Sequence, residues 1–599
     1  MKEYRQNGFE TITHRVDFCV VGGGLAGLCA AIAAARRGSS VALMQERPML
    51  GGNASSEIRM WVCGAFGENN RASGIIEEIE LENYYRNPDK IYALWDTILY
   101  EKAAKEENLT LLLNCTCCAC ECENDEIKSV LGFQMTTQTW QRVEATYFAD
   151  CSGDSALAAL CGADFRVGRE SAAEFGEHVS VLEADSKTMG MSCLIQYRKG
   201  ARPYRFIAPD WATKMTDEMI ALRTPAPESP YENFWYLELG GDRDSIKDTE
   251  LLRHELLALA LGMWDYIKNS GKISDADLLE LTFLGFLPGK RESRRLLGPV
   301  LVMQGDILSG GKFEDNVAFG GWPLDDHHPG GFYHKGIPNT NDRTPSPYGI
   351  PYRALYSRNI KNLFYAGRNI SMTHAAMSSA RVMATCATLG EAVGVAADIA
   401  REFSLSPNEV YEQKIRLLQN RLLDGGCFIP HLRREISALT QNATLQAQGR
   451  NVENLRNGAD RNNSTYGEAE QGAFLPLCEP VTYRLSSPEL VSAVRLAFDS
   501  DLCRATLPGG KCEREHSMRA WFDEAKSPTF YVPKTMVRSF KISATKKDGS
   551  EIVLAEVENN RLPVYTVSLE KEVESVTFTP LSTWDETAGE AHVFSFDLK

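Results

Sequence analysis

The sequence lacks any long run of basic residues, and its formal net charge is −16 at pH 7. Because such a chain repels polyanions, we expect neither a nucleic acid nor an anionic membrane as partner. No stretch reaches about 18 consecutive apolar residues, which argues against a membrane-spanning helix. Residues 1–14 are polar and lack the apolar core of a signal peptide, so we expect a cytoplasmic protein.

A complete set of metal ligands is also missing, although the chain has 16 cysteines. The dense group is Cys115, Cys117, Cys118, Cys120 and Cys122, which contains two C-x-x-C spacings. Neither a partner C-x-x-C nor a nearby histidine completes a zinc tetrad. Residues 109–122 alternate like a strand, which predicts Cys118, Cys120 and Cys122 on one face. We therefore expect reduced thiols that fill space, and no metal site.

With 599 residues, 43% of them hydrophobic, the chain is long enough for two or three globular domains. Near its start, residues 16–21 are typical of a buried parallel strand and residues 29–37 of a helix. Between them, Gly22, Gly24 and Gly27 fit G-x-G-x-x-G, the dinucleotide-binding turn. These glycines allow a tight turn, close approach to a pyrophosphate and close packing of helix on strand. Free N–H groups at the start of the helix would hold the phosphates.

A second apolar strand, residues 40–45, ends at Glu46, 19 residues after Gly27. A carboxylate at this distance binds the ribose of a dinucleotide, so we assign that role to Glu46. The glycine loop by itself holds either NAD or FAD. The paired glycines Gly51 and Gly52 then form a loop whose backbone can press against a flat ligand.

The domain organisation follows from where these patterns stop and return. Residues 1–170 carry the nucleotide-binding pattern, and residues 346–436 resume it with an apolar strand, the turn at Gly367 and a long small-residue helix over 378–401. Residues 171–345, with a helix over 249–269, predict an inserted α+β substrate domain. Residues 437–472 are polar and predict a linker. From residue 473 the hydrophobic period is two, which predicts an all-β sandwich or jelly roll over 473–599.

Taken together, these motifs resemble the FAD-dependent oxidoreductases of the glutathione-reductase-like superfamily, over about residues 15–430. The resemblance implies a Rossmann-like α/β domain and FAD as cofactor, with Gly51 to Ser55 beside the flavin and Gly367 near its ribityl chain or ring. Disulfide reductase activity is not expected, because Gly367-Arg368 replaces the Gly-Asp of those enzymes and only Cys63 stands where they carry C-x-x-x-x-C. The residues predicted to bind FAD are Gly22, Gly24, Leu25, Ala26, Gly27, Glu46, Arg47, Gly51, Gly52, Asn53, Ala54, Ser55, Gly153, Asp154, Gly367, Arg368 and Arg381.

The implied reaction is hydride transfer between a small organic substrate and flavin N5, with a paired proton transfer. His374, seven residues after Gly367, is the first candidate for the proton, and the alternative is a hydrogen-bonded structural histidine. His327 or His328 is the second candidate, with a surface turn as the alternative. Arg294, together with Arg291 and Arg295, could clamp a substrate carboxylate, or the three could form a solvated basic face. Asn53 and Glu57 could hydrogen-bond the ring or the substrate, whereas Asp325 and Asp326 are expected as turn residues.

Two alternatives remain open from the sequence. The first is an NAD(P)-dependent dehydrogenase. The second is a carbohydrate-binding or assembly protein with a structural flavin, because residues 473–599 resemble galactose-binding-like jelly rolls. Fold-level resemblance alone does not establish sugar binding.

Overall fold

Strand β1 (Thr11–Val21) lies near the middle of a seven-stranded mixed sheet, where its last four residues are buried. β2 (Val41–Met44) and β3 (Leu109–Leu112) follow on one side, and β6 (Thr139–Asp150) pairs with β1 on the other; all these pairings are parallel. β16 (Leu363–Tyr365), from far along the chain, pairs in parallel with the last three residues of β6. The carboxyl ends of β1, β2, β6 and β16 therefore lie at the same edge.

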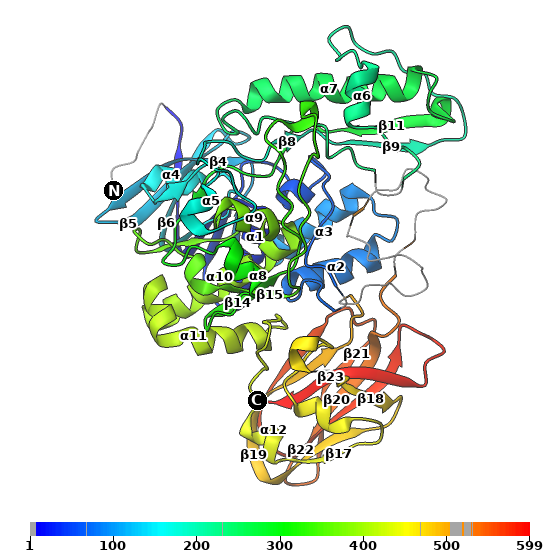
Figure 1. Cartoon of the computed structure of the whole chain (residues 1–599). Helices are drawn as coiled ribbons and strands as arrows, with labels where there is room; N and C mark the ends of the chain where they lie inside the picture. Colours follow the sequence, from blue (N-terminus) through cyan, green and yellow to red (C-terminus); the bar gives the residue numbers. More distant parts are fainter. Residues whose placement is uncertain are drawn as a thin grey trace.

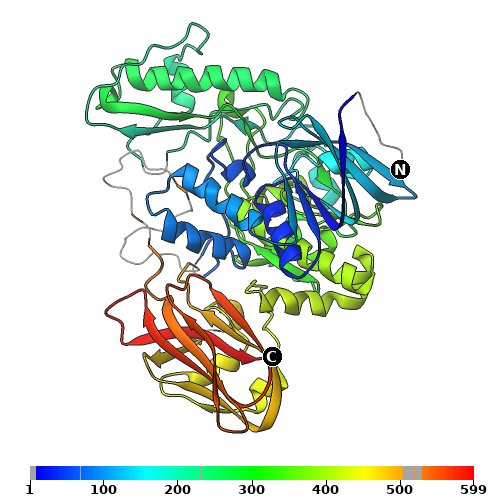
Figure 2. The ribbon, with the colours of Figure 1, turned by 180° about the vertical axis from the view of Figure 1, so that it is seen from behind.

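The computed structural model describes residues 8–67, 69–229, 232–467, 469–502, 518–519, 529 and 531–599. In Figures 1 and 2, which show it from opposite sides, the mixed sheet and its helices form the middle of the molecule. A region containing helix α7 (Thr249–Asn269) lies at one end, and an antiparallel β region in orange and red lies at the other.

β4 (Cys115–Glu123) and β5 (Glu126–Gln134) join the first part of β6 in an antiparallel meander. The prediction that Cys118 shares a face with Cys120 and Cys122 is wrong, because a register shift between Cys117 and Ala119 interrupts the alternation. Cys118 is exposed, whereas Cys117, Cys120 and Cys122 pack against the core. The cysteines that the structure describes are free thiols, and none of the described residues form a group able to hold a metal ion.

Helix α1 (Leu25–Arg36) packs against α10 (Met383–Phe403) without side chains between the two backbones at the closest points. A Cβ at Gly390 would lie 1.9 Å from the carbonyl oxygen of Ala26, and one at Gly394 would lie 2.2 Å from that of Ala30. α10 is long and apolar enough to cross a membrane by length and composition, but 94% of its most apolar window is buried in the structure. Its apolar character is therefore accounted for by packing in the core.

The predicted helix over 378–401 is two helices, α9 (His374–Ala380) and α10, separated at Arg381 and Val382. The other helices around the sheet are α2 (Ile75–Arg86), α3 (Tyr92–Ala104), α4 (Ala156–Cys161) and α11 (Pro407–Asp424). α7 was predicted with its observed bounds.

The region between β6 and β16 contains several small antiparallel sheets rather than one large one. In one of them, β8 (Met191–Ser192) lies between β10 (Glu238–Leu239) and β12 (Gly289–Lys290). The remaining elements of the region are β7 (Phe165–Arg166), α5 (Ala172–Phe175), β9 (Ile195–Lys199), α6 (Asp217–Leu222), β11 (Leu279–Leu284), β13 (Arg295–Leu296), α8 (Gln304–Leu308), β14 (Asn316–Gly320) and β15 (Tyr348–Pro351).

The C-terminal region is a separate, wholly antiparallel sheet, and its apolar core also includes Leu81 and Tyr84 of α2. Its strands are β17 (Thr444–Gln446), β18 (Ala473–Pro476), β19 (Val481–Phe498), β20 (Val537–Thr545), β21 (Glu551–Val557), β22 (Val564–Thr583) and β23 (Glu590–Leu598).

Residues 437–472 are not a free linker, contrary to the prediction. They supply α12 (Ala438–Asn442) and β17, which pairs with β19, and Leu455 is fully buried in the C-terminal core. Because most residues of this segment are polar, its sequence did not reveal the few apolar side chains that pack into the C-terminal core.

Candidate functional site

The loops that follow β1, β2, β6 and β16 lie at the carboxyl edge of the mixed sheet. Together with the inserted region they enclose a cavity of about 650 Å³. Open α/β sheets bind ligands at this edge, where the loops of neighbouring parallel strands converge. The cavity is therefore the candidate site.

Two glycines of the first loop hold it against neighbouring backbone. Gly22 has a φ of +104°, and a Cβ there would lie 2.5 Å from the carbonyl carbon of Cys151. A Cβ at Gly27 would lie 1.8 Å from the carbonyl oxygen of Gly22. Gly24 differs, because its nearest neighbour would be the Cα of Gly52 at 4.0 Å and it lines the cavity. The side of Gly24 that a Cβ would occupy is open to a ligand.

Helix α1 begins at this loop with its first N–H groups uncapped. Gly24 is the N-cap and provides no side-chain hydrogen bond, and the first turn contains no acidic residue. Leu25 and Ala26 line the cavity. Free N–H groups at the positive end of the helix dipole are the donors that a diphosphate requires.

Glu46 and Arg47, at the end of β2, also line the cavity. The side chain of Glu46 is 59% exposed, so its carboxylate is accessible. Nε of Arg47 lies 3.6 Å from Glu46 and 3.8 Å from Glu57, and it is buried without a hydrogen-bond partner among the described residues. Burial raises the pKa of Glu57 above its usual value, although Arg47 acts against this rise. Glu57 does not line the cavity, so the predicted contact with ring or substrate is not seen.

The second glycine loop lies directly against the first. Gly51 has a φ of +100° and forms a short parallel bridge with Gly24. Gly52 and Asn53 line the cavity, and the Asn53 amide donates to the carbonyl oxygen of Lys290 at 3.1 Å. Two further residues predicted to bind FAD are fully buried behind the loop and do not line the cavity: Ala54 and Ser55.

Asp154, at the turn after β6, binds two cations. Its carboxylate lies 2.6 Å from Nζ of Lys290 and 2.6 Å from Nη2 of Arg368. Burial acts to raise the pKa of Asp154, but Arg368 and Lys290 outweigh burial and lower it. Gly153, with a φ of +75°, leaves room for the Arg368 guanidinium. These residues and Gly367 line the cavity, and the buried Nε of Arg368 has no hydrogen-bond partner in the described part of the chain.

A second charged group, which we call the His327 cluster, consists of Glu238, Arg291, Asp325, His327 and Arg381. Nδ1 of His327 lies 2.6 Å from Glu238, and Nε2 lies 3.4 Å from Asp325. Arg291 is 3.5 Å from Glu238, and Arg381 is 3.1 Å from Asp325. All members except the buried Glu238 line the cavity. The structure therefore places Arg381, predicted to bind FAD, beside His327.

Both carboxyl groups of the cluster are held ionised. Burial would raise the pKa of Glu238, but Arg291 and His327 lower it overall. Burial would likewise raise the pKa of Asp325, but His327 and Arg381 hold it well below its usual range. An ionised Glu238 can accept a hydrogen bond from Nδ1–H of His327, while Nε2 lies on the side of Asp325.

The structure does not bring Arg291, Arg294 and Arg295 together as a clamp, because Arg295 lies outside the cavity that the other two line. Arg295 is 1% exposed, does not line the cavity and binds Glu170 at 2.9 Å. Arg294 lines the cavity, but its guanidinium donates to the carbonyl oxygen of Asp154 at 3.2 Å. Only Arg291 belongs to the His327 cluster.

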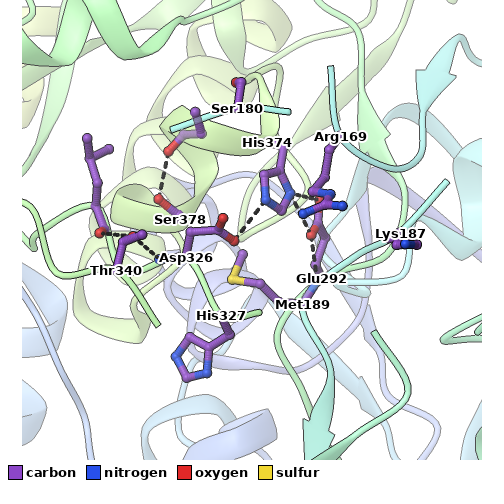
Figure 3. A network of polar contacts seen from close by, with 12 residues as sticks. Arg169, Ser180, Lys187, Met189, Glu292, Asp326, His327, Thr340, His374 and Ser378 are labelled. Atoms are coloured by element: carbon purple, nitrogen blue, oxygen red, sulfur yellow. Dashed lines mark hydrogen bonds and ion pairs between the residues drawn. The ribbon is translucent and has the colours of Figure 1, made fainter. Parts of the chain in front are cut away.

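His374 does not line the cavity, contrary to the prediction that it could face the flavin ring. It is 1% exposed, and its ring lies between Glu292 and Asp326, each 2.9 Å away. Figure 3 shows these contacts, with His327 apart from them. Burial alone would lower the pKa of His374, but Glu292 and Asp326 raise it to about 10. Because Asp326 is the chain neighbour of Asp325 and His327, this ion pair fixes the loop that carries them.

His328 is also outside the cavity. Its ring is exposed and stacks on His334 with ring centroids 3.5 Å apart. Of the three predicted histidines, the structure brings only His327 to the site.

Sequence reasoning missed several polar and aromatic residues of the site, because they follow no recognisable motif. They line the cavity around the His327 cluster, or in the case of Glu238 lie directly behind it: Asn233, Trp235, Glu238, Trp322, Asn339 and Asn341.

Comparisons with known proteins give one extensive match. A family model described as FAD dependent oxidoreductase matches residues 17–422, which is more than half of the chain. A comparison with curated proteins found no match.

Similar solved structures are distant. Quinol fumarate reductase FrdA of E. coli is 14% identical, with a TM-score of 0.27, over 69% of this chain and 75% of that one. Anhydrotetracycline hydroxylase OxyS of Streptomyces rimosus is 13% identical, with a TM-score of 0.21, over 32% and 39%. A family 32 carbohydrate-binding module of EndoD from Streptococcus pneumoniae is 15% identical, with a TM-score of 0.19, over 27% and 99%. TM-scores this low establish neither a fold nor a function.

Proposed function

The chain belongs to the family of FAD dependent oxidoreductases, and we propose that it transfers a hydride between a small organic substrate and FAD, with His327 exchanging the accompanying proton. The observation that carries this proposal is the cavity itself. At one side lies the glycine loop of residues 22–27 at the uncapped start of α1, which we call the glycine cradle. At the other lies the buried pair of His327 and Glu238.

The residues around the glycine cradle fit FAD. The N–H groups of Leu25 and Ala26 are available to the pyrophosphate, the open side of Gly24 permits its approach, and Glu46 offers an exposed carboxylate to the ribose. Nε of Arg47 and Nε of Arg368 are buried donors that no described residue satisfies, as expected where a ligand completes the hydrogen bonds. When bound, FAD supplies the two-electron chemistry, while the protein orients the substrate and handles its proton.

His327 is suited to the proton transfer by its two unequal carboxylate contacts. Glu238, at 2.6 Å, fixes the ring and holds the proton on Nδ1, so that Nε2 can take a proton from the substrate. Asp325, at 3.4 Å from Nε2, stabilises the imidazolium that then forms. In the reverse direction the same nitrogen donates the proton.

The alternative of an NAD(P)-dependent dehydrogenase is not supported, because the matched family uses FAD. A carbohydrate-binding or assembly role for residues 473–599 stays a prediction beside the catalytic one.

The test is anaerobic mixing of the purified flavoprotein with hydroxy acids, amines and sugars, followed by the absorbance of the oxidised flavin. We expect FAD to be released on denaturation of the native protein, and at least one compound to bleach the flavin. A protein that binds no FAD, or whose flavin no organic compound reduces, would contradict the proposal.

A further inference from the structure

We infer that the substrate is a neutral polyhydroxylated compound, of the pyranose or sugar-alcohol type, which is oxidised at a secondary hydroxyl group. The inference rests on the proposed function, since it names the substrate class for the same cavity. Charge balance, hydrogen-bonding capacity and aromatic surface around His327 carry it.

The charges of the His327 cluster are paired within the cluster. Each guanidinium of the His327 cluster already has a carboxylate partner, Arg291 with Glu238 at 3.5 Å and Arg381 with Asp325 at 3.1 Å. The two guanidinium charges and the two carboxylate charges cancel. A substrate carboxylate would have to compete with Asp325 for Arg381 and would lie close to that like charge. The cluster is therefore better suited to a substrate without charge.

The cavity wall near the cluster also offers amide groups for hydrogen bonding. The amide side chains of Asn233, Asn339 and Asn341 line the cavity together with the cluster. Asn339 donates to Asp325 of the cluster, and Asn233 accepts from the backbone N–H of Trp235 at 3.2 Å. An amide offers donors and an acceptor at once, as does a hydroxyl group. Several such groups in one wall match a substrate with several hydroxyls.

Two tryptophans add aromatic surface to the cavity. The Trp235 ring lies 5.2 Å from that of His327, and the Trp322 N–H points to Asp325 at 3.4 Å. Both side chains line the cavity. Indole rings provide flat apolar surface with a polar edge, which complements the C–H face and hydroxyl rim of a sugar ring.

The reaction balances with groups already assigned. Nε2 of His327 takes the hydroxyl proton, and the carbon that carries this hydroxyl gives up its hydrogen as hydride. FAD, when bound, would supply the oxidant for this hydride and its two electrons. The O–H and C–H bonds break, the C=O double bond forms, and the product is a ketone.

The experiment compares neutral compounds with their charged counterparts in anaerobic bleaching of the flavin. Glucose, galactose, mannitol and myo-inositol are tested beside gluconate, glucuronate, lactate, malate and primary amines. We expect at least one neutral polyol to bleach the flavin, and faster than the acid derived from it. If only carboxylates or amines bleach it, the proposed function stands and this inference fails. If nothing bleaches it, both fail.

A charge variant separately tests the role of the paired charges in the His327 cluster. Asp325→Asn removes one carboxylate and leaves Arg381 without its partner charge. We compare the affinity for the derived carboxylate with the affinity for the neutral substrate. The ratio of the first to the second is expected to be about tenfold higher in the variant than in the wild type. Asp342→Asn is the matched control, because Asp342 is half exposed and does not line the cavity. An equal ratio of affinities in Asp325→Asn and Asp342→Asn would overturn the inference.

Discussion

His327 combines burial, access to the cavity and one blocked ring nitrogen. Its replacement in His327→Gln keeps a hydrogen-bonding side chain but removes the group that takes the proton. We expect the rate of flavin reduction to fall by about 10²–10⁴-fold, the usual contribution of a general base, with the FAD content unchanged. Stopped-flow reduction under anaerobic conditions measures the rate.

The adjacent residue provides the control for this prediction. His328 is exposed and stacked on His334, so His328→Gln should reduce its flavin at the wild-type rate. Equal rates in His327→Gln and the wild type would remove His327 from the mechanism.

The choice among the three histidines could not be made from the sequence. His327 and His328 are neighbours in one loop, and only the tertiary contacts with Glu238 and His334 separate a cavity residue from a surface residue. His374 follows the glycine turn at the distance expected for a residue at the ring. Its carboxylate partners, Glu292 and Asp326, come from segments that carry no recognisable motif.

At the scale of secondary structure, the parallel strands and their glycine turns could be predicted, because apolar runs and glycine spacing can be read from a short stretch of sequence. The break between α9 and α10 could not, since residues 376–385 contain neither glycine nor proline to end a helix. Arg381 leaves the helix there and reaches Asp325, a contact that the sequence does not reveal. Likewise, the register shift after Cys117 is set by pairing with β5 and not by the cysteines themselves.

His374, the first residue of α9, ties that helix to the loop of His327 through Asp326. Its pKa is raised from 6.5 to about 10, so the folded state binds the proton more tightly than the unfolded state. The resulting stabilisation is fully present below pH 6.5 and is lost as the pH rises toward 10. We therefore expect the wild-type free energy of unfolding to fall across this interval, by at most about 1.4 kcal/mol per pH unit from this group.

His374→Gln should lack this contribution to the pH dependence. Denaturant unfolding of both proteins at a series of pH values measures the difference. If the two free energies of unfolding run parallel between pH 6.5 and 10, the charged state assigned to His374 is wrong.

At the scale of the whole molecule, the C-terminal sheet is joined to the α/β region by a buried arginine. Arg495, on β19, is 1% exposed; it donates to the carbonyl oxygen of Asp424 at the end of α11 at 2.8 Å and binds Asp460 at 2.6 Å. Arg495→Met would leave the Asp460 carboxylate, which is 19% exposed, and the buried Asp597 carboxylate without one of their partners. We expect a loss of about 3–5 kcal/mol in unfolding free energy.

The exposed pair of Arg450 and Glu590, also in the C-terminal region, gives the control. Arg450→Met should cost less than about 1 kcal/mol, because exposed ion pairs contribute little. Calorimetry of the three proteins tests this, and equal losses in both variants would show that the Arg495 contacts do not join the regions.

Titration of FAD into apoprotein tests most directly whether the glycine cradle holds the cofactor. In Gly24→Ala the new methyl group meets no protein atom closer than 4.0 Å, so the fold should persist while the methyl occupies the space of the pyrophosphate. The control is Gly305→Ala, at an exposed position of helix α8 with nothing within 4 Å of the added Cβ. We predict that wild type and Gly305→Ala bind FAD equally, and that Gly24→Ala binds it at least about tenfold more weakly, a loss of about 1.4 kcal/mol. Equal affinity in all three proteins would contradict the placement of FAD in this cavity.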